Sequence, residues 1–305
     1  MQICITFAAR IEHNQFCNYP IFMKKYFAIA MVALMASFST NAQDQVQPYF
    51  TVDQLPDLIK CLPAPPAFDS PEFANDMMRF AWGKQQRLNE ERAEIAKRDA
   101  VWSYEALLAE FDVPFGLHIS PENTPEIWKL MVTSMTTTDA MRVAPKAFYH
   151  RQRPFERYQD KMLTDEEAEL AGEGSYPSGH TMRGWTAALL LAEVNPAAAD
   201  TIFARGWMYG ESRVIVGAHW QSDVDASRVA ASIGVCALHG SPEFREQMAK
   251  AQEEYLEKTG QLSSINNVID NAPAAVDQAY RIDGIKATDD TRGIIIQDGK
   301  KILRN

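Results

Sequence analysis

The chain has 305 residues, of which 46% are hydrophobic and 23% are charged, and its formal net charge is −10. This length and composition suffice to bury a full core, which excludes wholesale disorder and collagen-like or low-complexity classes. The acidic balance argues against a nucleic-acid binder, which needs Lys and Arg to neutralise phosphates, but it leaves room for a small anion in a locally basic pocket.

The N-terminal segment has the pattern of a secretory signal peptide. Met23, Lys24 and Lys25 precede an apolar run over 26–38, and small residues lead to Ala42. The run is shorter than the ~20 residues that cross a bilayer, although a buried N-terminal helix is an alternative. We therefore interpret 1–22 as an over-extended start and 23–42 as a signal peptide cleaved after Ala42. The mature protein is then expected in the periplasm.

Helical signals run through residues 43–258. Helix starts repeatedly combine Ser or Thr with Pro and Glu, because the hydroxyl accepts from free N–H groups and Pro suits the first helical position. Residues 164–167 have the pattern of a capping box, and strand alternation is nearly absent. The helical periods are clearest over 71–98, 125–142, 180–194, 197–210 and 242–258. We predict one all-helical domain over 43–258.

The C-terminal segment has a different pattern. Residues 259–292 have the composition of a polar linker, and Asp298–Gly299 separates two short apolar runs, as in a hairpin turn. We expect residues 259–305 to be a linker and a tail that forms a β-hairpin, with a poorly ordered terminus as the alternative. Cys61 and Cys236 could pair in an oxidising compartment or remain free thiols.

Three short motifs carry the candidate chemistry. K-x6-R-P begins at Lys146, P-S-G-H spans 177–180, and S-R-x5-H-x3-D begins at Ser212. The second motif predicts a tight turn that opens a helix near residue 180, where N–H groups and a partial positive charge can bind an anion. The Ser178 hydroxyl can add a donor, and Gly179 allows close backbone approach. An ordinary capped helix is the alternative.

The histidine of the third motif is a candidate nucleophile or base. His219 and Asp223 are four residues apart and share a face if this segment is helical. The carboxylate would then fix the imidazole tautomer and leave the other nitrogen reactive. An exposed polar pair is the alternative. A metal site that adds His180 is disfavoured, because the nearby Lys and Arg residues would repel a divalent cation.

Lys146, Arg153 and Arg213 form a candidate oxyanion site. Each alone would be an ordinary surface charge. As a set beside a helix N-terminus and two histidines, they suit a tetrahedral oxyanion, because guanidinium groups bind phosphate oxygens in pairs.

Taken together, the motifs resemble the type 2 phosphatidic acid phosphatase superfamily. More closely, the chain resembles the secreted class A bacterial non-specific acid phosphatases, whose signature G-S-Y-P-S-G-H-T stands at 174–181. G-E-S-R-V-I at 210–215, H-W-Q-S-D-V-D at 219–225 and L-P-A-P-P-A at 62–67 also match. The resemblance covers about 57–257 and implies an all-α helical bundle.

The resemblance also implies residue roles. His219 becomes the nucleophile, Asp223 its orienting partner and His180 the general acid. The phosphate cradle becomes Lys146, Arg153, Ser178, Gly179 and Arg213. The expected reaction is hydrolysis of small phosphomonoesters through a phosphohistidine, at acidic to near-neutral pH. It needs no metal or cofactor because Lys and Arg supply the charge. The loop at 155–173 departs from the family pattern, which leaves substrate preference open.

Other functions remain open at this point. Vanadate-dependent haloperoxidases resemble the chain at the same three motifs, and lipid or pyrophosphate phosphatases belong to the same superfamily. A non-catalytic phosphate-binding protein is more remote, because binding alone requires neither histidine. We expect small phosphomonoesters as partners, no nucleic acid and no membrane-embedded segment. Homo-oligomerisation stays open.

Overall fold

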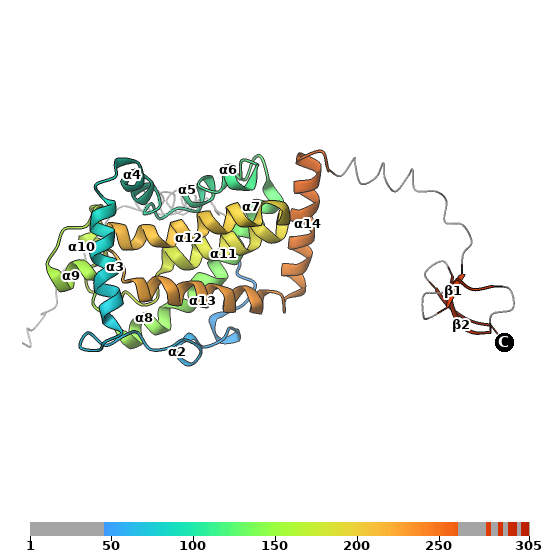
Figure 1. Ribbon diagram of the computed structural model, residues 1–305, viewed down its shortest axis with the longest axis horizontal. Coiled ribbons are helices and arrows are strands. Elements are labelled where there is room, and N and C mark those ends of the chain that lie inside the picture. The colour runs from blue at the N-terminus through green and yellow to red at the C-terminus, as the bar shows by residue number, and fades with distance from the viewer. Residues whose placement is uncertain (1–45, 262–278, 282–285, 289–291, 298–299, 305) are drawn as a thin grey trace, which may run out of the picture. The chain divides into compact units, whose positions relative to one another are not determined.

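The computed structural model describes residues 46–261 and, in the C-terminal tail, 279–281, 286–288, 292–297 and 300–304 (Figure 1). The predictions of an over-extended start and a signal peptide therefore lie outside the described residues. None of the described helices is long and apolar enough to cross a membrane.

The helical domain confirms the expected all-α class. The short N-terminal and connecting helices are η1 (Val52–Gln54), α2 (Leu58–Cys61), α4 (Glu90–Arg98), α5 (Tyr104–Ala109), α6 (Asp112–Phe115), η2 (Ala140–Arg142), α8 (Val143–Tyr149), α9 (Pro154–Tyr158), α10 (Glu167–Leu170) and η3 (Pro196–Ala198). The longer helices are α3 (Phe73–Gln86), α7 (Pro125–Asp139), α11 (Gly179–Val194), α12 (Ala199–Val216), α13 (Gln221–Leu238) and α14 (Pro242–Lys258).

Local chemistry explains where several helices begin. The Ser241 hydroxyl accepts from the Phe244 N–H at 3.2 Å, and Pro242 follows at the first helical position, as predicted for α14. The helix predicted over 71–98 is instead two helices. Asn89 is extended, and its side chain accepts from the Arg92 N–H at 3.1 Å, so it starts α4 afresh.

Two other predicted boundaries differ from the structure. The capping box predicted at 164–167 is not formed: α10 begins only at Glu167, and the Thr164 hydroxyl donates to the Glu166 carboxylate at 2.5 Å. The helix predicted over 197–210 continues as α12 to Val216, which places Arg213 in its last turn. Both differences bear on the site, because Glu166 and Arg213 meet there.

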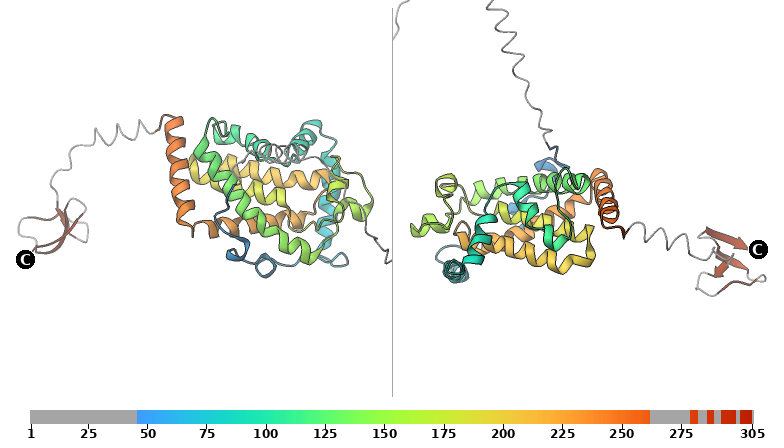
Figure 2. Two further views of the ribbon diagram at one scale, coloured as in Figure 1. Left: turned by 180° about the vertical axis from the view of Figure 1, so that it is seen from behind. Right: turned by 90° about the horizontal axis from the view of Figure 1, so that it is seen from above.

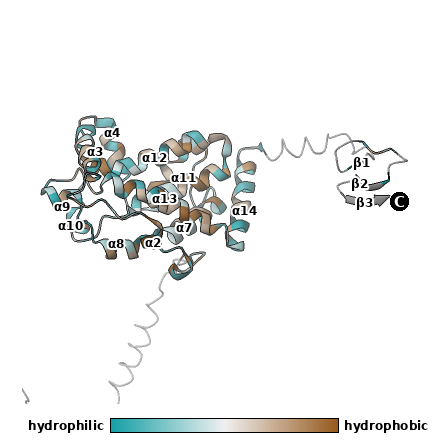
Figure 3. Ribbon diagram, turned by 60° about the horizontal axis from the view of Figure 1, so that its bottom comes forward, coloured by the Kyte–Doolittle hydropathy of each residue, from teal (hydrophilic) through white to brown (hydrophobic). Residues whose placement is uncertain are grey.

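Helix α11 lies in the core and contacts α7, α12 and α13. Ala187, Leu190 and Leu191 on α11 are fully buried. Glycines let α12 approach closely: a Cβ on Gly206 would lie 2.5 Å from the Ala188 Cβ. Figure 3 shows apolar residues along α11 and α12, whereas α9 and α10 are largely polar. The bundle therefore holds the start of α11 rigidly from several sides.

The bundle has two distinct ends. Helix α14 stands at one end, and α3, α9 and α10 lie at the other (Figures 1 and 2). The chain reverses between α12 and α13 through Gly217, whose φ of 87° belongs to the left-handed region that glycine tolerates. The start of α11 and the end of α12 carry motif residues toward the end with α9 and α10.

The described tail residues form a separate antiparallel sheet in the order β1–β2–β3. Strands β2 (Gly293–Gln297) and β3 (Lys300–Arg304) pair with Ile295 opposite Ile302, as expected for the hairpin. Strand β1 (Ala279–Arg281) pairs with β2 and lies in the segment predicted to be a linker. The composition signal therefore missed this strand, which is only three residues long.

Candidate active site

A pocket of about 220 Å³ opens at the end of the bundle where α11 begins. The sequence had predicted six residues of its lining: Lys146, Arg153, Gly179, His180, Arg213 and His219. The other two predicted residues, Ser178 and Asp223, are fully buried. The three motifs therefore converge on one site, although more than 50 residues separate the end of the first motif from the start of the last.

Two cations of the pocket come from the first motif. Lys146 lies on α8, and its Nζ donates to the Gly174 carbonyl at 2.8 Å. Arg153 is the N-cap residue of α9 and is 1% exposed; its guanidinium donates to the Ala218 carbonyl at 2.9 Å. Burial, together with the nearby Arg153, lowers the pKa of Lys146 to about 8. The Lys146 ammonium therefore gives up its proton more readily than an exposed lysine does.

His219 has one nitrogen directed at this cationic group. Its Nε2 lies 3.1 Å from Arg153 Nη1. Arginine has donors only, so Nε2 must accept, and the neutral ring carries its proton on Nδ1. Burial and the charges of Arg153, Lys146 and Arg213 hold the pKa of His219 well below its usual range. The resting imidazole is therefore neutral, with an unprotonated nitrogen in the pocket.

Asp223 lies behind His219 in the first turn of α13. Its Oδ2 is 3.4 Å from His219 Nδ1, a distance that is long for a hydrogen bond, and also accepts from the Trp220 N–H at 2.9 Å. The two residues do not share a helix face as predicted, because His219 belongs to the loop before α13. Asp223 nevertheless faces the imidazole from the expected side.

A buried chain of charges extends behind Asp223. Arg151 donates from Nη1 to Asp223 at 2.6 Å and from Nη2 to Asp76 at 2.8 Å. Asp76 lies on α3 and also accepts from the Ser222 N–H at 2.8 Å. The side chains of Arg151 and Asp76 are 3% and 1% exposed, so this chain of contacts is shielded from water. It ties α3 and the start of α13 to the position of Asp223.

His180 lies across the pocket at the start of α11. Its Nε2 is 3.0 Å from the Ala100 carbonyl, so Nε2 carries a proton and Nδ1 is left for a second one. The Trp102 ring packs against the His180 ring in a tilted arrangement, with an interplanar angle of 59° and a centroid distance of 4.6 Å. Burial and the charge of Arg213 hold the pKa of His180 well below its usual range. A bound anion would oppose both effects and favour the charged imidazolium.

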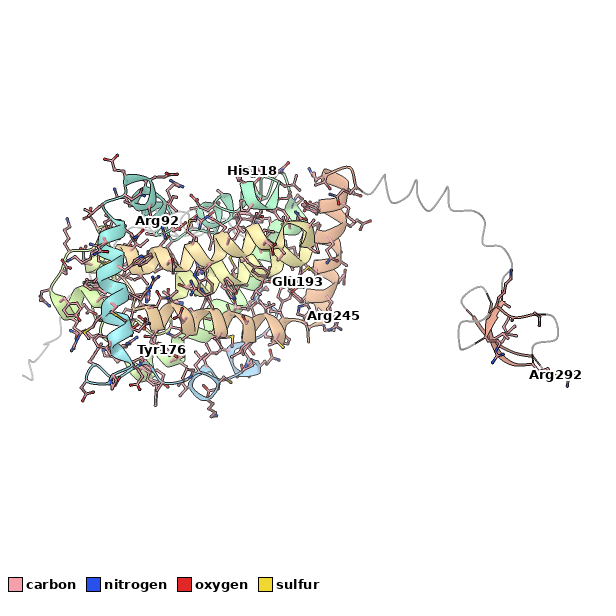
Figure 4. All side chains as sticks on the ribbon, in the orientation of Figure 1. Arg92, His118, Tyr176, Glu193, Arg245 and Arg292 are labelled. Carbon is pink, nitrogen blue, oxygen red and sulfur yellow. The ribbon has the colours of Figure 1, made fainter. Side chains whose placement is uncertain are left out.

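Ser178 and Gly179 build the turn that opens α11. The Ser178 hydroxyl accepts from the Thr181 N–H at 3.3 Å and from the Thr181 hydroxyl at 3.0 Å, so it acts as a helix cap here. A Cβ on Gly179 would lie 2.9 Å from the Arg142 side chain. Just before this turn, Tyr176 (Figure 4) donates from its hydroxyl to the Pro63 carbonyl at 2.6 Å. These contacts fix the N–H groups of the helix start beside the cations.

Three glutamates line the pocket, and two of them pair with its cations. Glu166 accepts from both terminal nitrogens of Arg213, at 3.0 and 3.3 Å. Glu173 accepts from Lys146 at 2.9 Å and from Arg153 at 3.3 Å. Burial alone would raise the pKa of Glu173, but Lys146, Arg153 and Arg142 outweigh it and lower that pKa. Both glutamates lie in the segment 155–173 or at its edge and escaped the sequence prediction.

The donor set of the pocket suits an anion. Among the described residues, no group of three or more His, Cys, Asp or Glu side chains has an arrangement that could hold a metal ion. The pocket instead offers Lys and Arg donors, a helix N-terminus and two imidazoles. Sequence reasoning also missed Asp76, Trp102 and Arg142, because they belong to no motif and reach the site only through the fold.

Comparison with known proteins agrees with this chemistry. Residues 127–245, which contain every predicted site residue, match the PAP2 superfamily model. A non-specific acid phosphatase of Providencia stuartii is 41% identical over 209 residues, 68% of this chain and 84% of the relative. One from Salmonella typhimurium is 35% identical over 79% of this chain and 96% of the relative. An acid phosphatase of Zymomonas mobilis is 33% identical over 75% of this chain and 90% of the relative.

Proposed function

The chain belongs to the PAP2 superfamily and is an acid phosphatase, and we propose that it hydrolyses small phosphomonoesters through a phosphohistidine on His219, without a metal ion. Lys146, Arg153, Arg213 and the N–H groups at the start of α11 would bind the phosphate oxygens. These groups neutralise the charge that develops during transfer. The named relatives are acid phosphatases, which favours hydrolysis over the haloperoxidase and non-catalytic alternatives.

The proposed reaction has two steps. In the first, the lone pair on His219 Nε2 attacks phosphorus, the bond from phosphorus to the ester oxygen breaks, and that oxygen takes a proton from charged His180. In the second, water attacks phosphorus, the P–N bond breaks, and His180 takes the proton of the water. Phosphate then leaves and both imidazoles return to their starting state. Asp223 would keep the His219 proton on Nδ1 throughout.

One observation carries this proposal. Arg153 can only donate, and it lies 3.1 Å from His219 Nε2 inside a cationic pocket. The nitrogen that faces the anion site must therefore be unprotonated, and its lone pair becomes available to phosphorus when it leaves the contact with Arg153. A binding protein would gain nothing from such a nitrogen, because an unprotonated imidazole nitrogen cannot donate to phosphate.

Activity assays with two histidine variants test the proposal. His219→Ala should lower kcat on p-nitrophenyl phosphate by at least about 10³-fold, because the attacking group is gone. His118→Ala is the matched control: its side chain is 64% exposed and pairs with Asp112 outside the pocket, so activity should not change. A chelator should leave the wild-type rate unchanged. Near-normal activity of His219→Ala would refute the nucleophile, and loss of activity with the chelator would refute metal independence.

We also propose export to the periplasm with removal of a signal peptide. The support is the sequence of 23–42, where two lysines, a short apolar run and small residues follow one another. Expression of the full chain in a bacterium, followed by fractionation and N-terminal sequencing, should yield periplasmic protein that begins at Gln43. Full-length protein confined to the cytoplasm would contradict export.

A further inference from the structure

Carboxylates already occupy the cations of the proposed phosphate cradle. Glu166 takes both terminal nitrogens of Arg213, the geometry in which a guanidinium binds two phosphate oxygens. Glu173 bridges Lys146 and Arg153 at 2.9 and 3.3 Å. Arg213 Nε has no partner among the described contacts, but the pair of terminal nitrogens that can bind two oxygens at once is taken by Glu166. A phosphate group that binds in this paired geometry therefore competes with the carboxylates.

The two sides of these ion pairs differ in burial. The side chains of Arg213, Arg153 and Lys146 are 0%, 1% and 8% exposed, so the cations are enclosed by protein. The partner side chains are more accessible: Glu166 is 19% exposed and Glu173 is 42% exposed. A carboxylate with access to water can rotate away, whereas the buried cations remain in place. In this pocket the carboxylates can therefore be replaced by another anion while the cations stay in place.

We propose that Glu166 and Glu173 are specificity-determining residues that compete with the phosphate group for the cradle. This inference rests on the proposed function and names the property of the substrate that the site selects. In the resting enzyme the carboxylates spare the protein the cost of buried, unpaired cations. When substrate arrives, its oxygens replace them, and when inorganic phosphate leaves, the carboxylates return.

Competition of this kind favours one class of ligand. A phosphomonoester has three unesterified oxygens and up to two negative charges, enough to replace carboxylates on both Arg213 and the Lys146–Arg153 pair. A phosphodiester has two such oxygens and one charge, and is a weaker competitor. The same exchange weakens binding of the product, inorganic phosphate. The glutamates therefore select monoesters and hasten product release at some cost in affinity.

Three matched variants test the inference. Glu166→Gln and Glu173→Gln keep the side-chain shape and remove the competing charge. Glu169→Gln is the control, because Glu169 lies on α10 and lines the same pocket, yet the described contacts give it no ion pair with the cradle. The dissociation constant of inorganic phosphate is measured by calorimetry on the full mature chain. Its inhibition constant and the KM for p-nitrophenyl phosphate are measured in parallel, with melting temperature as a check on folding.

The inference predicts that Glu166→Gln and Glu173→Gln each bind inorganic phosphate about tenfold more tightly, with a lower KM, while Glu169→Gln stays within about twofold. Unchanged or weaker binding in both Glu166→Gln and Glu173→Gln would overturn it, because the glutamates would then only position the cradle. An equal gain in Glu169→Gln would also overturn it, because a general charge effect would explain the result. Calorimetry needs no turnover, so a failure of the proposed reaction would be seen separately. If one variant does not fold, Glu166→Ala or Glu173→Ala takes its place.

Discussion

At the residue scale, the two pocket histidines have the same resting state but different proposed tasks. Burial and nearby cations keep the pKa of both well below the usual range, so both rings are neutral in the unliganded enzyme. His219 can use that state directly as a nucleophile. His180 must gain a proton to act as an acid, and the bound phosphate supplies the negative charge that favours it.

This difference predicts a pH dependence for His180. In the free enzyme, His180 must be protonated to act as the acid, but its pKa is lowered. The fraction of enzyme with protonated His180, and with it kcat/KM, should therefore fall as pH rises from the acidic range toward neutrality. In the bound complex phosphate raises that pKa, and the fall in kcat should come at higher pH. Profiles of kcat/KM and kcat from about pH 4 to about pH 8 measure how far apart in pH the two constants fall. Coincident profiles would contradict the role of phosphate in charging His180.

Leaving groups separate the acid from the nucleophile. His180→Asn should reduce kcat on glycerol phosphate by about 10² to 10⁴-fold, because an alkoxide needs a proton to depart. The loss on p-nitrophenyl phosphate should be much smaller, because nitrophenolate leaves without one. Equal losses on the two substrates would argue that His180 does not donate the proton.

The sequence predicts the site residues that belong to one of the three motifs. Lys146, His180 and His219 stand at fixed spacings, and the fold places all three at the pocket as expected. Glu173 touches the same cations but lies in the spacer between two motifs, where spacing carries no signal. Ser178 is predicted to bind phosphate, and its hydroxyl caps α11. Its contact with phosphate stays a prediction.

At the element scale, α3 connects to the reaction through one buried carboxylate. Asp76 lies on α3, and its contacts with Arg151 and the Ser222 N–H hold the base of α13 and, through Arg151, Asp223. Helical periodicity predicts a helix here, but the sequence alone does not distinguish a buried Asp on that helix from an exposed one. Only the packing of α3 against α12 and α13 shows why the position needs a charge.

Asp76→Asn should misplace His219 without touching the cradle. The amide offers one acceptor oxygen in place of two and removes the charge that balances Arg151. We expect kcat to fall by about 10 to 100-fold, since small displacements of a reacting group are costly. The dissociation constant of inorganic phosphate should stay unchanged, which a general loss of structure would not allow. Asp69→Asn, in the exposed loop before α3, is the control. Equal effects on kcat and phosphate binding would contradict a positioning role.

Element boundaries were harder to predict than element types, for identifiable reasons. The 71–98 helix breaks because Asn89 satisfies the free N–H groups of a new helix better than it continues the old one. Helix α12 runs beyond 210 because Val214, Ile215 and Val216 are buried against neighbouring elements, a tertiary effect. This extension places Arg213 in the last turn of α12, from which its side chain lines the pocket.

At the scale of the whole molecule, the net charge of −10 gives no sign of the local group of cations at the pocket. The acidic balance is a total over the whole chain, whereas the proposed reaction depends on a few buried cations around the start of α11. Charge averaged over the chain disfavours nucleic acid as a target, which stays a prediction, and gives no information about phosphate. The family match over 127–245 and the pocket geometry supply what composition could not.

The most direct measurement of the central claim is to trap the phosphoenzyme. Wild type, His219→Ala and His118→Ala are mixed with a ³²P-labelled monoester, quenched within milliseconds in alkali and mapped by peptide analysis. Wild type and His118→Ala should carry label on His219, stable in alkali and lost in acid, while His219→Ala carries none and does not turn over. Label on a different residue, or full turnover by His219→Ala, would contradict phosphoryl transfer through His219.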